Sequence, residues 1–173
     1  SRRCGADVPF LRPPYLAEDH SKTINVLIDL INELSKLGSS YDYLILLQPT
    51  QPLRKAFHID ESIAKTIDNG YKSLLSVSPV GDHPILIRTL NSQGKLQNIL
   101  NISSTIRRQD FPTCYKVNGA IYINKLDEEF NKSTSLNDNM YPYFMDKKYD
   151  LDIDEPFDLE LLKLKLLLQG NAR

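Results

Sequence analysis

Apolar residues recur at helical spacing in three segments of the chain. In residues 21–37 they fall three or four positions apart, and Gly38 follows, so we predict a helix that ends there. Residues 58–69 repeat the pattern and predict a second helix. Residues 155–168 predict a last helix, which is rich in leucine and carries acidic side chains near its start.

Short apolar runs without helical spacing predict the strands. Residues 43–47 form a continuous apolar run, which is typical of a strand buried on both faces. We predict further strands in residues 73–80, 85–90 and 116–124, whereas the polar stretch 91–113 is expected to be exposed or paired with another surface. The alternation of strands and helices predicts one α/β domain over the whole chain, with a mostly parallel sheet, helices on both faces and an inserted arm.

Composition and charge narrow the classes of function. The 173 residues are 41% hydrophobic and 25% charged, as in an ordinary soluble domain. The 21 basic and 22 acidic side chains leave a net charge of -1, which gives no general attraction to nucleic acid or membrane. No apolar stretch is long enough to span a bilayer, and Cys4 and Cys114 indicate reduced thiols. We therefore predict a cytoplasmic protein.

Asp152 and Asp154 are the first candidate for chemistry. Two residues apart in an extended segment, they direct their carboxylates to one side. One or two carboxylates with phosphate oxygens and water suit Mg²⁺. The alternative is that they only decorate the start of the last helix, and the short pattern taken alone favours this alternative.

Gln48, Thr50 and Arg54 lie in a loop directly after the first predicted strand. Ligands of open α/β sheets bind beyond the carboxyl ends of the strands, and a glutamine amide both donates and accepts hydrogen bonds. A rigid proline-rich turn is an equal alternative.

Arg107 and Arg108 precede an Asn118-Gly119 pair by ten residues. Guanidinium groups bind carboxylates and phosphates through paired hydrogen bonds, so this segment could recognise an acid. The alternatives are a solvated charged loop and a simple hairpin turn at Asn-Gly. Arg12 alone indicates little, and we assign no histidine a catalytic role.

Together these segments resemble the acylneuraminate cytidylyltransferases, the CMP-sialic acid synthetases. Residues 5–13 are similar to the family's segment after its second strand, and residues 47–54 to its L-Q-P-T-S-P-L-R, with Gln51 in place of serine. Residues 107–112 and 118–122 resemble its R-R-Q-D-x-P and N-G-A-I-Y, and residues 152–154 its D-I-D. The resemblance covers essentially the whole chain.

The resemblance implies a Rossmann-like nucleotide-diphospho-sugar transferase fold and a role for each matching residue. Asp152 and Asp154 would hold Mg²⁺, with CTP and a nine-carbon keto sugar acid as substrates. The remaining assignments place Gln48, Asn118, Tyr122 and Thr50 around the sugar, Arg12 and Thr23 at the nucleotide, and Arg108 at the sugar carboxylate. It also implies a homodimer built through an arm around residues 91–145.

Two departures from the family pattern keep alternatives open. Nothing in the sequence matches the family's glycine-rich phosphate loop, so we expect this chain to be N-terminally incomplete, to bind CTP poorly and to be inactive alone. Ser135-Leu136 replace an aromatic pair where the sugar would be read. The alternatives are therefore a CMP-legionaminate, CMP-pseudaminate or CMP-Kdo synthetase, or an inactive fragment that retains the sugar pocket and the dimer arm.

Overall fold

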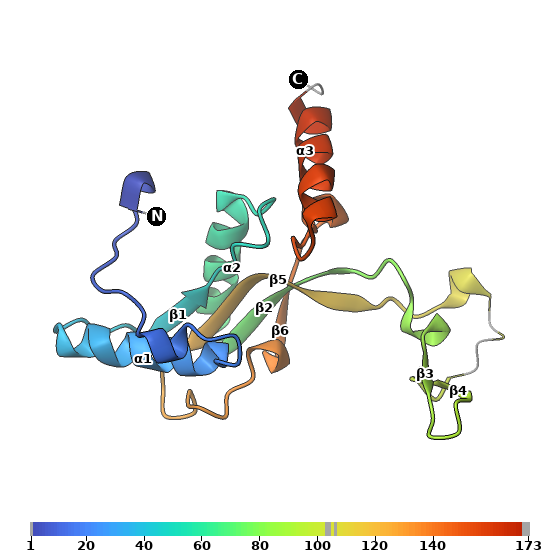
Figure 1. Ribbon diagram of the computed structural model, residues 1–173, viewed down its shortest axis with the longest axis horizontal. Helices are drawn as coiled ribbons and strands as arrows, with labels where there is room; N and C mark the ends of the chain where they lie inside the picture. The colour runs from blue at the N-terminus through green and yellow to red at the C-terminus, as the bar shows by residue number, and fades with distance from the viewer. Residues whose placement is uncertain (1, 103–104, 106, 171–173) are drawn as a thin grey trace.

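The computed structural model describes residues 2–102, 105 and 107–170. A four-stranded sheet with the order β1-β5-β2-β6 forms its centre, and a separate two-stranded hairpin projects to one side (Figure 1). The strands of the main sheet are β1 (Tyr43–Leu46), β2 (Ser73–Pro79), β5 (Tyr115–Lys125) and β6 (Tyr141–Phe144). Among the described helices, none is both long and apolar enough to cross a membrane.

The pairing of the strands corrects the prediction of a mostly parallel sheet. β5 pairs antiparallel with both β1 and β2, and only β2 and β6 pair in parallel. The prediction was wrong because of β5, which enters the sheet directly from the projecting hairpin region instead of from a crossover helix. β1, β2 and β6 nevertheless run in the same direction.

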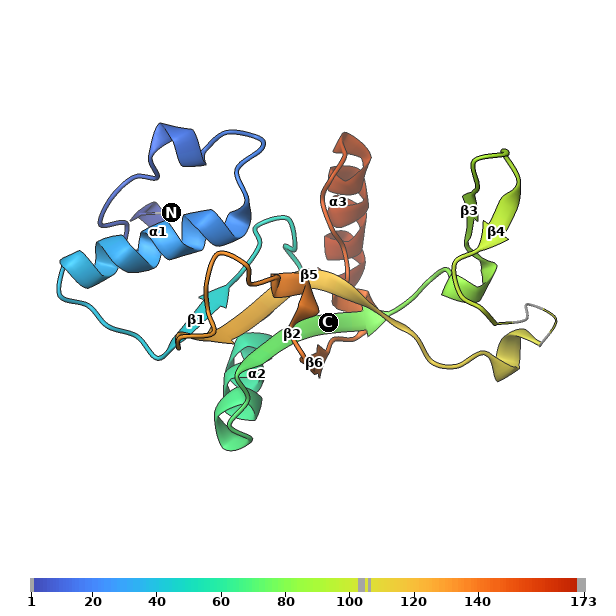
Figure 2. The ribbon, with the colours of Figure 1, turned by 90° about the horizontal axis from the view of Figure 1, so that it is seen from below.

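The helices follow the predicted periodicity closely and lie on both sides of the sheet (Figure 2). Their bounds are α1 (Thr23–Lys36), α2 (Ala56–Asp68) and α3 (Pro156–Gly170). Ile59 and Ile63 of α2 pack against the main apolar core, which includes Leu74, Ile121 and Ile123. A smaller cluster around Tyr122 occupies the opposite face, and α3 extends away from the sheet (Figure 1).

The projecting arm consists of β3 (Arg88–Leu90), β4 (Leu96–Asn98) and the short 3-10 helix η4 (Arg108–Asp110). The first part of the strand predicted at 85–90 is a 3-10 turn instead, because Pro84 and the ring of His83 begin a tight turn there. The arm thus begins at β3, before residue 91, and the later part of the predicted range 91–145 belongs to the main sheet as β5 and β6.

Candidate active site

A cavity of about 400 Å³ lies beyond the carboxyl end of β1 and unites three residues that the sequence singled out: Thr23, Gln48 and Tyr122. Thr23 begins α1, and Gln48 follows β1 by two residues. Tyr122 is the partner of Leu46 in the β1–β5 register, so pairing of these strands sets it beside the loop that carries Gln48. The remaining lining residues are Lys22, Ile24, Leu46 and the four residues Thr134, Ser135, Leu136 and Asn137.

The loop carrying Gln48 is fastened to β5 by Arg54. The Arg54 Nη1 donates to the backbone oxygens of Gln48 (3.2 Å) and Ala120 (2.8 Å). Burial lowers the pKa of Arg54 below its ordinary value. Arg54 thus has a structural role here, because its half-buried guanidinium holds the Gln48 carbonyl beside β5.

Gly119 brings the backbone of β5 against the Gln48 side chain. Its φ is +74°, and a Cβ at this position would lie 2.3 Å from Gln48 Oε1. Glycine meets both demands, since it adopts positive φ freely and leaves room for the amide. Asn118-Gly119 thus lies inside a strand, and the hairpin turn considered from the sequence does not form here.

Tyr122 is a buried hydrogen-bond donor in the cavity. Its side chain is largely enclosed, and its hydroxyl donates to Asn137 Oδ1 at 3.0 Å. Burial raises the pKa of Tyr122, and the negative charge of Asp152 raises it further. Tyr122 accordingly keeps its proton, and Asp152 lies close enough for its charge to be felt there.

The Asp152–Asp154 segment is attached to the same loop. The backbone N–H of Ile153 donates to the backbone oxygen of Thr50 at 2.9 Å. Asp152 Oδ1 is buried and has no hydrogen-bond partner among the described residues, whereas Asp154 is exposed. Another acid fixes the start of α3: Asp158, in its first turn, accepts hydrogen bonds from the backbone N–H groups of Asp154 (3.0 Å) and Glu155 (2.8 Å), which precede the helix.

This donor set fits Mg²⁺. The unpartnered Asp152 oxygen costs free energy unless a cation or a donor reaches it, and Asp154 offers an open carboxylate two residues on. No group of three or more His, Cys, Asp or Glu side chains in the described chain could hold a metal. A magnesium ion here would therefore complete its shell with phosphate oxygens and water, as this ion commonly does.

Asn118 supports the cavity from within the sheet. It is buried, accepts a hydrogen bond from Ser76 Oγ (2.5 Å) and donates to Ser78 Oγ (2.7 Å). This network spans the irregularity in the β2–β5 register between Leu75 and Val77. The amide of Asn118 is thus occupied inside the protein.

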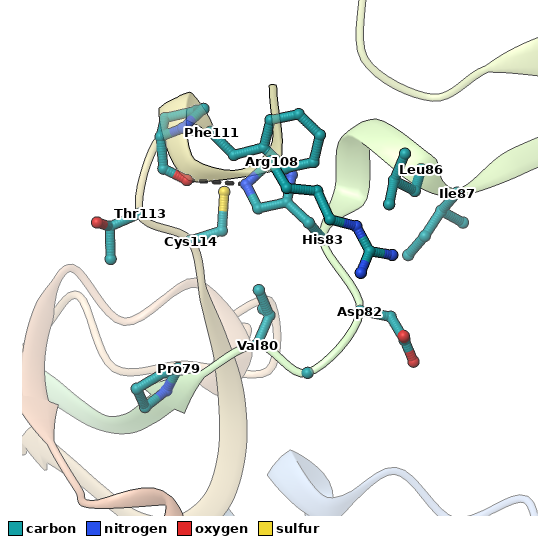
Figure 3. A pocket seen from close by; sticks show the side chains of 12 residues that line it. Pro79, Val80, Asp82, His83, Leu86, Ile87, Arg108, Phe111, Thr113 and Cys114 are labelled. Atoms are coloured by element: carbon teal, nitrogen blue, oxygen red, sulfur yellow. Dashed lines mark hydrogen bonds between the residues drawn. The ribbon is translucent and has the colours of Figure 1, made fainter. Parts of the chain in front are cut away.

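Arg108 and Arg12 lie apart from the cavity. Arg108 is on the arm, where it lines a second cavity of about 790 Å³ with Asp82 and Phe111 (Figure 3). In that cavity His83 Nε2 donates to the Pro112 oxygen (2.8 Å), and Nδ1 accepts from Ile85 N–H. Arg12 is exposed in the segment before α1.

Comparison of the sequence with known proteins identifies the family of the chain. No family model matches the sequence. The chain is 33% identical over 170 residues to the CMP-N,N'-diacetyllegionaminic acid synthase of Legionella pneumophila, covering 97% of this chain and 72% of that protein. The chain belongs to the N-acylneuraminate cytidylyltransferase family.

Other relatives in this family are longer. The chain is 30% identical over 144 residues to an N-acylneuraminate cytidylyltransferase of Streptococcus agalactiae, which is 83% of this chain but 34% of that protein. It is 29% identical over 159 residues to an Escherichia coli enzyme of the same name, with 91% of this chain and 36% of that protein covered. The chain thus spans about a third of the length of these cytidylyltransferases.

Lys22, Thr134 and Asn137 line the cavity but were not singled out from the sequence. Lys22 falls at the start of the predicted helix 21–37, whereas Thr134 and Asn137 stand in a segment without periodic or motif spacing. Ser135 and Leu136, where the sequence departs from the family pattern, line the same cavity. Because Asn137 directly follows Ser135 and Leu136, this departure from the family pattern was the signal that could have pointed to it.

Proposed function

We propose that this chain transfers CMP from CTP to the anomeric hydroxyl of a nine-carbon keto sugar acid, with release of pyrophosphate. The observation that carries the proposal is the cavity beyond β1, in which Gln48, Tyr122 and Thr23 converge. The charge of Asp152 reaches Tyr122 and raises its pKa, and one buried oxygen of Asp152 has no partner among the described residues. Membership of the cytidylyltransferase family supports it.

In the proposed reaction the anomeric hydroxyl attacks the α-phosphorus of CTP. The new bond joins that oxygen to phosphorus, the bond to the pyrophosphate oxygen breaks, and the hydroxyl proton leaves to water or a base. Asp152 and Asp154 would hold Mg²⁺, which when bound neutralises charge on the phosphate oxygens. The chain's own contribution is orientation, because Gln48 and Tyr122 hold the sugar next to these acids.

The other predicted residues take supporting roles in this proposal. Thr50 fixes the acidic segment through its backbone oxygen, and Asn118 stabilises β5 next to Gly119. Thr23 and Arg12 would contact the nucleotide from the α1 side. Arg108 would reach the acid's carboxylate from the arm of a second subunit, since in its own chain it lies on the arm and away from the cavity.

A legionaminic-type acid is the second candidate substrate. The relative from Legionella pneumophila, whose name specifies N,N'-diacetyllegionaminic acid, matches 97% of the chain. Ser135 and Leu136 give the cavity a small polar and an aliphatic surface where the family's sialic-acid pattern has aromatic side chains.

Pyrophosphate release tests the proposal directly. The protein as encoded by its gene is incubated with CTP, Mg²⁺ and each of a panel of nonulosonic acids, with UTP in place of CTP as the control. We expect release that depends on CTP and on at least one acid, and that falls strongly in Gln48→Ala but not in Gln93→Ala, an exposed position on the arm. Absence of release with every acid would contradict the proposal.

A further inference from the structure

The loop that closes the cavity carries a side chain that can read a substituent of the sugar acid. We propose that Asn137 is a specificity-determining residue, whose amide N–H donates to the carbonyl oxygen of an acylamino group on the substrate. This inference rests on the proposed function and narrows its substrate class to acids with an acylamino group at the position facing this loop.

The hydrogen bonds of Asn137 define what it can offer. Its Oδ1 already accepts the Tyr122 hydroxyl at 3.0 Å, and its Nδ2 donates to no described residue. The side chain is exposed and lines the cavity. A primary amide has two N–H donors, so the group that Asn137 presents to a ligand is a donor that requires an acceptor such as a carbonyl oxygen.

Tyr122 fixes the direction of this amide. Its hydroxyl donates to the oxygen of Asn137, so the Nδ2 group is the part of the amide that faces away from the phenol. The Tyr122 hydroxyl is thus engaged with Asn137, and Asp152 Oδ1 has no hydrogen-bond partner among the described residues.

The rest of the lining matches an acylamino group. Among the described residues that line the cavity, Lys22 is the only charged one. The others are neutral hydrogen-bonding groups together with the aliphatic side chains of Ile24, Leu46 and Leu136. An acetamido group combines a carbonyl acceptor, an N–H donor and a methyl group, whereas a hydroxyl in its place offers neither the reach of the carbonyl nor the methyl group.

The test compares two acids that differ at one carbon: a nine-carbon acid with an acetamido group and its analogue with a hydroxyl there. The measured quantity is the ratio of their kcat/KM values in the pyrophosphate assay. We expect the wild-type protein to prefer the acetamido acid by about tenfold or more, the typical effect of one hydrogen bond with a buried apolar contact.

Asn137→Asp is the sharpest variant, because it keeps an oxygen for Tyr122 and removes the N–H donor. Its added negative charge weakens both acids equally and cancels in the ratio, which should fall to about twofold or less. Asn137→Ala should give the same ratio, and Asn131→Asp, the same charge change in the same loop outside the cavity, should keep the wild-type ratio. The KM for CTP should stay unchanged throughout.

The outcomes separate the two proposals. If neither acid gives pyrophosphate with the wild-type protein, both the proposed function and this inference fail. If both acids react but the wild-type protein shows no preference, or the Asn137 variants keep the wild-type ratio, only the inference fails. Equal losses for both acids in Asn137→Ala would likewise overturn it, since they would indicate a purely structural residue.

Discussion

Gly119 occupies a position in β5 that favours glycine for two reasons. Its φ is positive, and a Cβ there would require the end of the Gln48 side chain to move. A backbone position inside a strand therefore determines where a proposed substrate-binding amide lies. The Asn-Gly pair in the sequence indicated a special backbone position at Gly119, but not that the Gln48 side chain would lie against it.

Replacement of Gly119 should disturb both stability and the site. We expect Gly119→Ala to lower the free energy of unfolding by about 1–3 kcal/mol through backbone strain, with a further 1–3 kcal/mol from the clash with Gln48. Gly94→Ala is the matched control, because Gly94 has a φ of +72° with nothing within 4 Å of an added Cβ. Urea unfolding measures both variants, and an equal effect would show that the Gln48 contact is soft.

Mutations should give different effects for the two acids of the D-I-D segment, which should affect turnover, and for Asp158, which should affect stability. We expect Asp152→Asn and Asp154→Asn to lower turnover by about 100-fold or more with little loss of stability, because Asp152 Oδ1 has no partner to lose. Asp158→Ala should instead destabilise the protein by about 1 kcal/mol, since Asp158 accepts two backbone hydrogen bonds that fix the start of α3. Pyrophosphate release and thermal unfolding are the measurements. Near-normal rates in both aspartate variants would contradict a role in metal binding and favour the alternative that these acids only stand at the start of α3.

At the scale of elements, the spacing of apolar residues predicted each long helix to within about two residues. In α2 this spacing reflects the face that packs against the sheet, whereas α3 extends away from the sheet. Strand direction was not predictable in this way. A continuous apolar run such as that in β5 is the same in parallel and antiparallel pairing, so only the path of the chain through the arm decides it. β6 was missed because it is short and contains Pro142, which an edge strand tolerates.

The packing of α2 on the sheet should be sensitive to acid through His58. This side chain is buried among Phe57, Tyr143 and Tyr149, and burial holds its pKa below the ordinary value of 6.5, opposed in part by Glu61. The unfolded chain then binds a proton more readily than the folded one. The stabilisation is complete above pH 6.5 and is lost as the pH falls through the folded-state pKa.

Chemical denaturation between pH 7.5 and 5 checks this expectation. We expect the free energy of unfolding to fall with the pH below about 6.5, and His58→Gln to flatten that part of the profile. The exposed His20, which pairs with Glu18, supplies the control variant His20→Gln. If the free energy of unfolding of His58→Gln depended on pH as it does in the wild-type protein, a group other than His58 would be responsible for the acid sensitivity.

At the scale of the molecule, the fold brings together only some of the residues that the sequence assigned to the substrate site. Gln48, Tyr122 and Thr23 meet because β1 and β5 are neighbours and α1 begins above them. Arg108 was expected at the same sugar, yet in this chain it lies on the arm. No spacing in a sequence distinguishes a residue that acts in its own subunit from one that completes the site of another.

The arm carries an exposed apolar surface of the kind that a partner would cover. Leu90 and Leu96 face each other in the β3–β4 register and are 67% and 71% exposed, and Ile87, Ile99 and Ile102 nearby are also exposed. A hairpin with only two strands is marginally stable alone, so a partner that covers these residues would stabilise it. We expect a two-fold dimer joined through the arms, which would also carry Arg108 toward the other subunit's cavity.

A charge in the centre of this surface should separate the subunits. We expect Leu90→Asp combined with Leu96→Asp to raise the dimer Kd by about 100-fold or more, because each buried apolar anchor is worth more than about 1 kcal/mol. Leu37→Asp, an exposed leucine at the end of α1, should leave the Kd unchanged. Light scattering over a concentration series measures the Kd. A wild-type chain that stays monomeric well above assay concentrations would contradict the dimer, and would leave Arg108 without a route to the sugar acid.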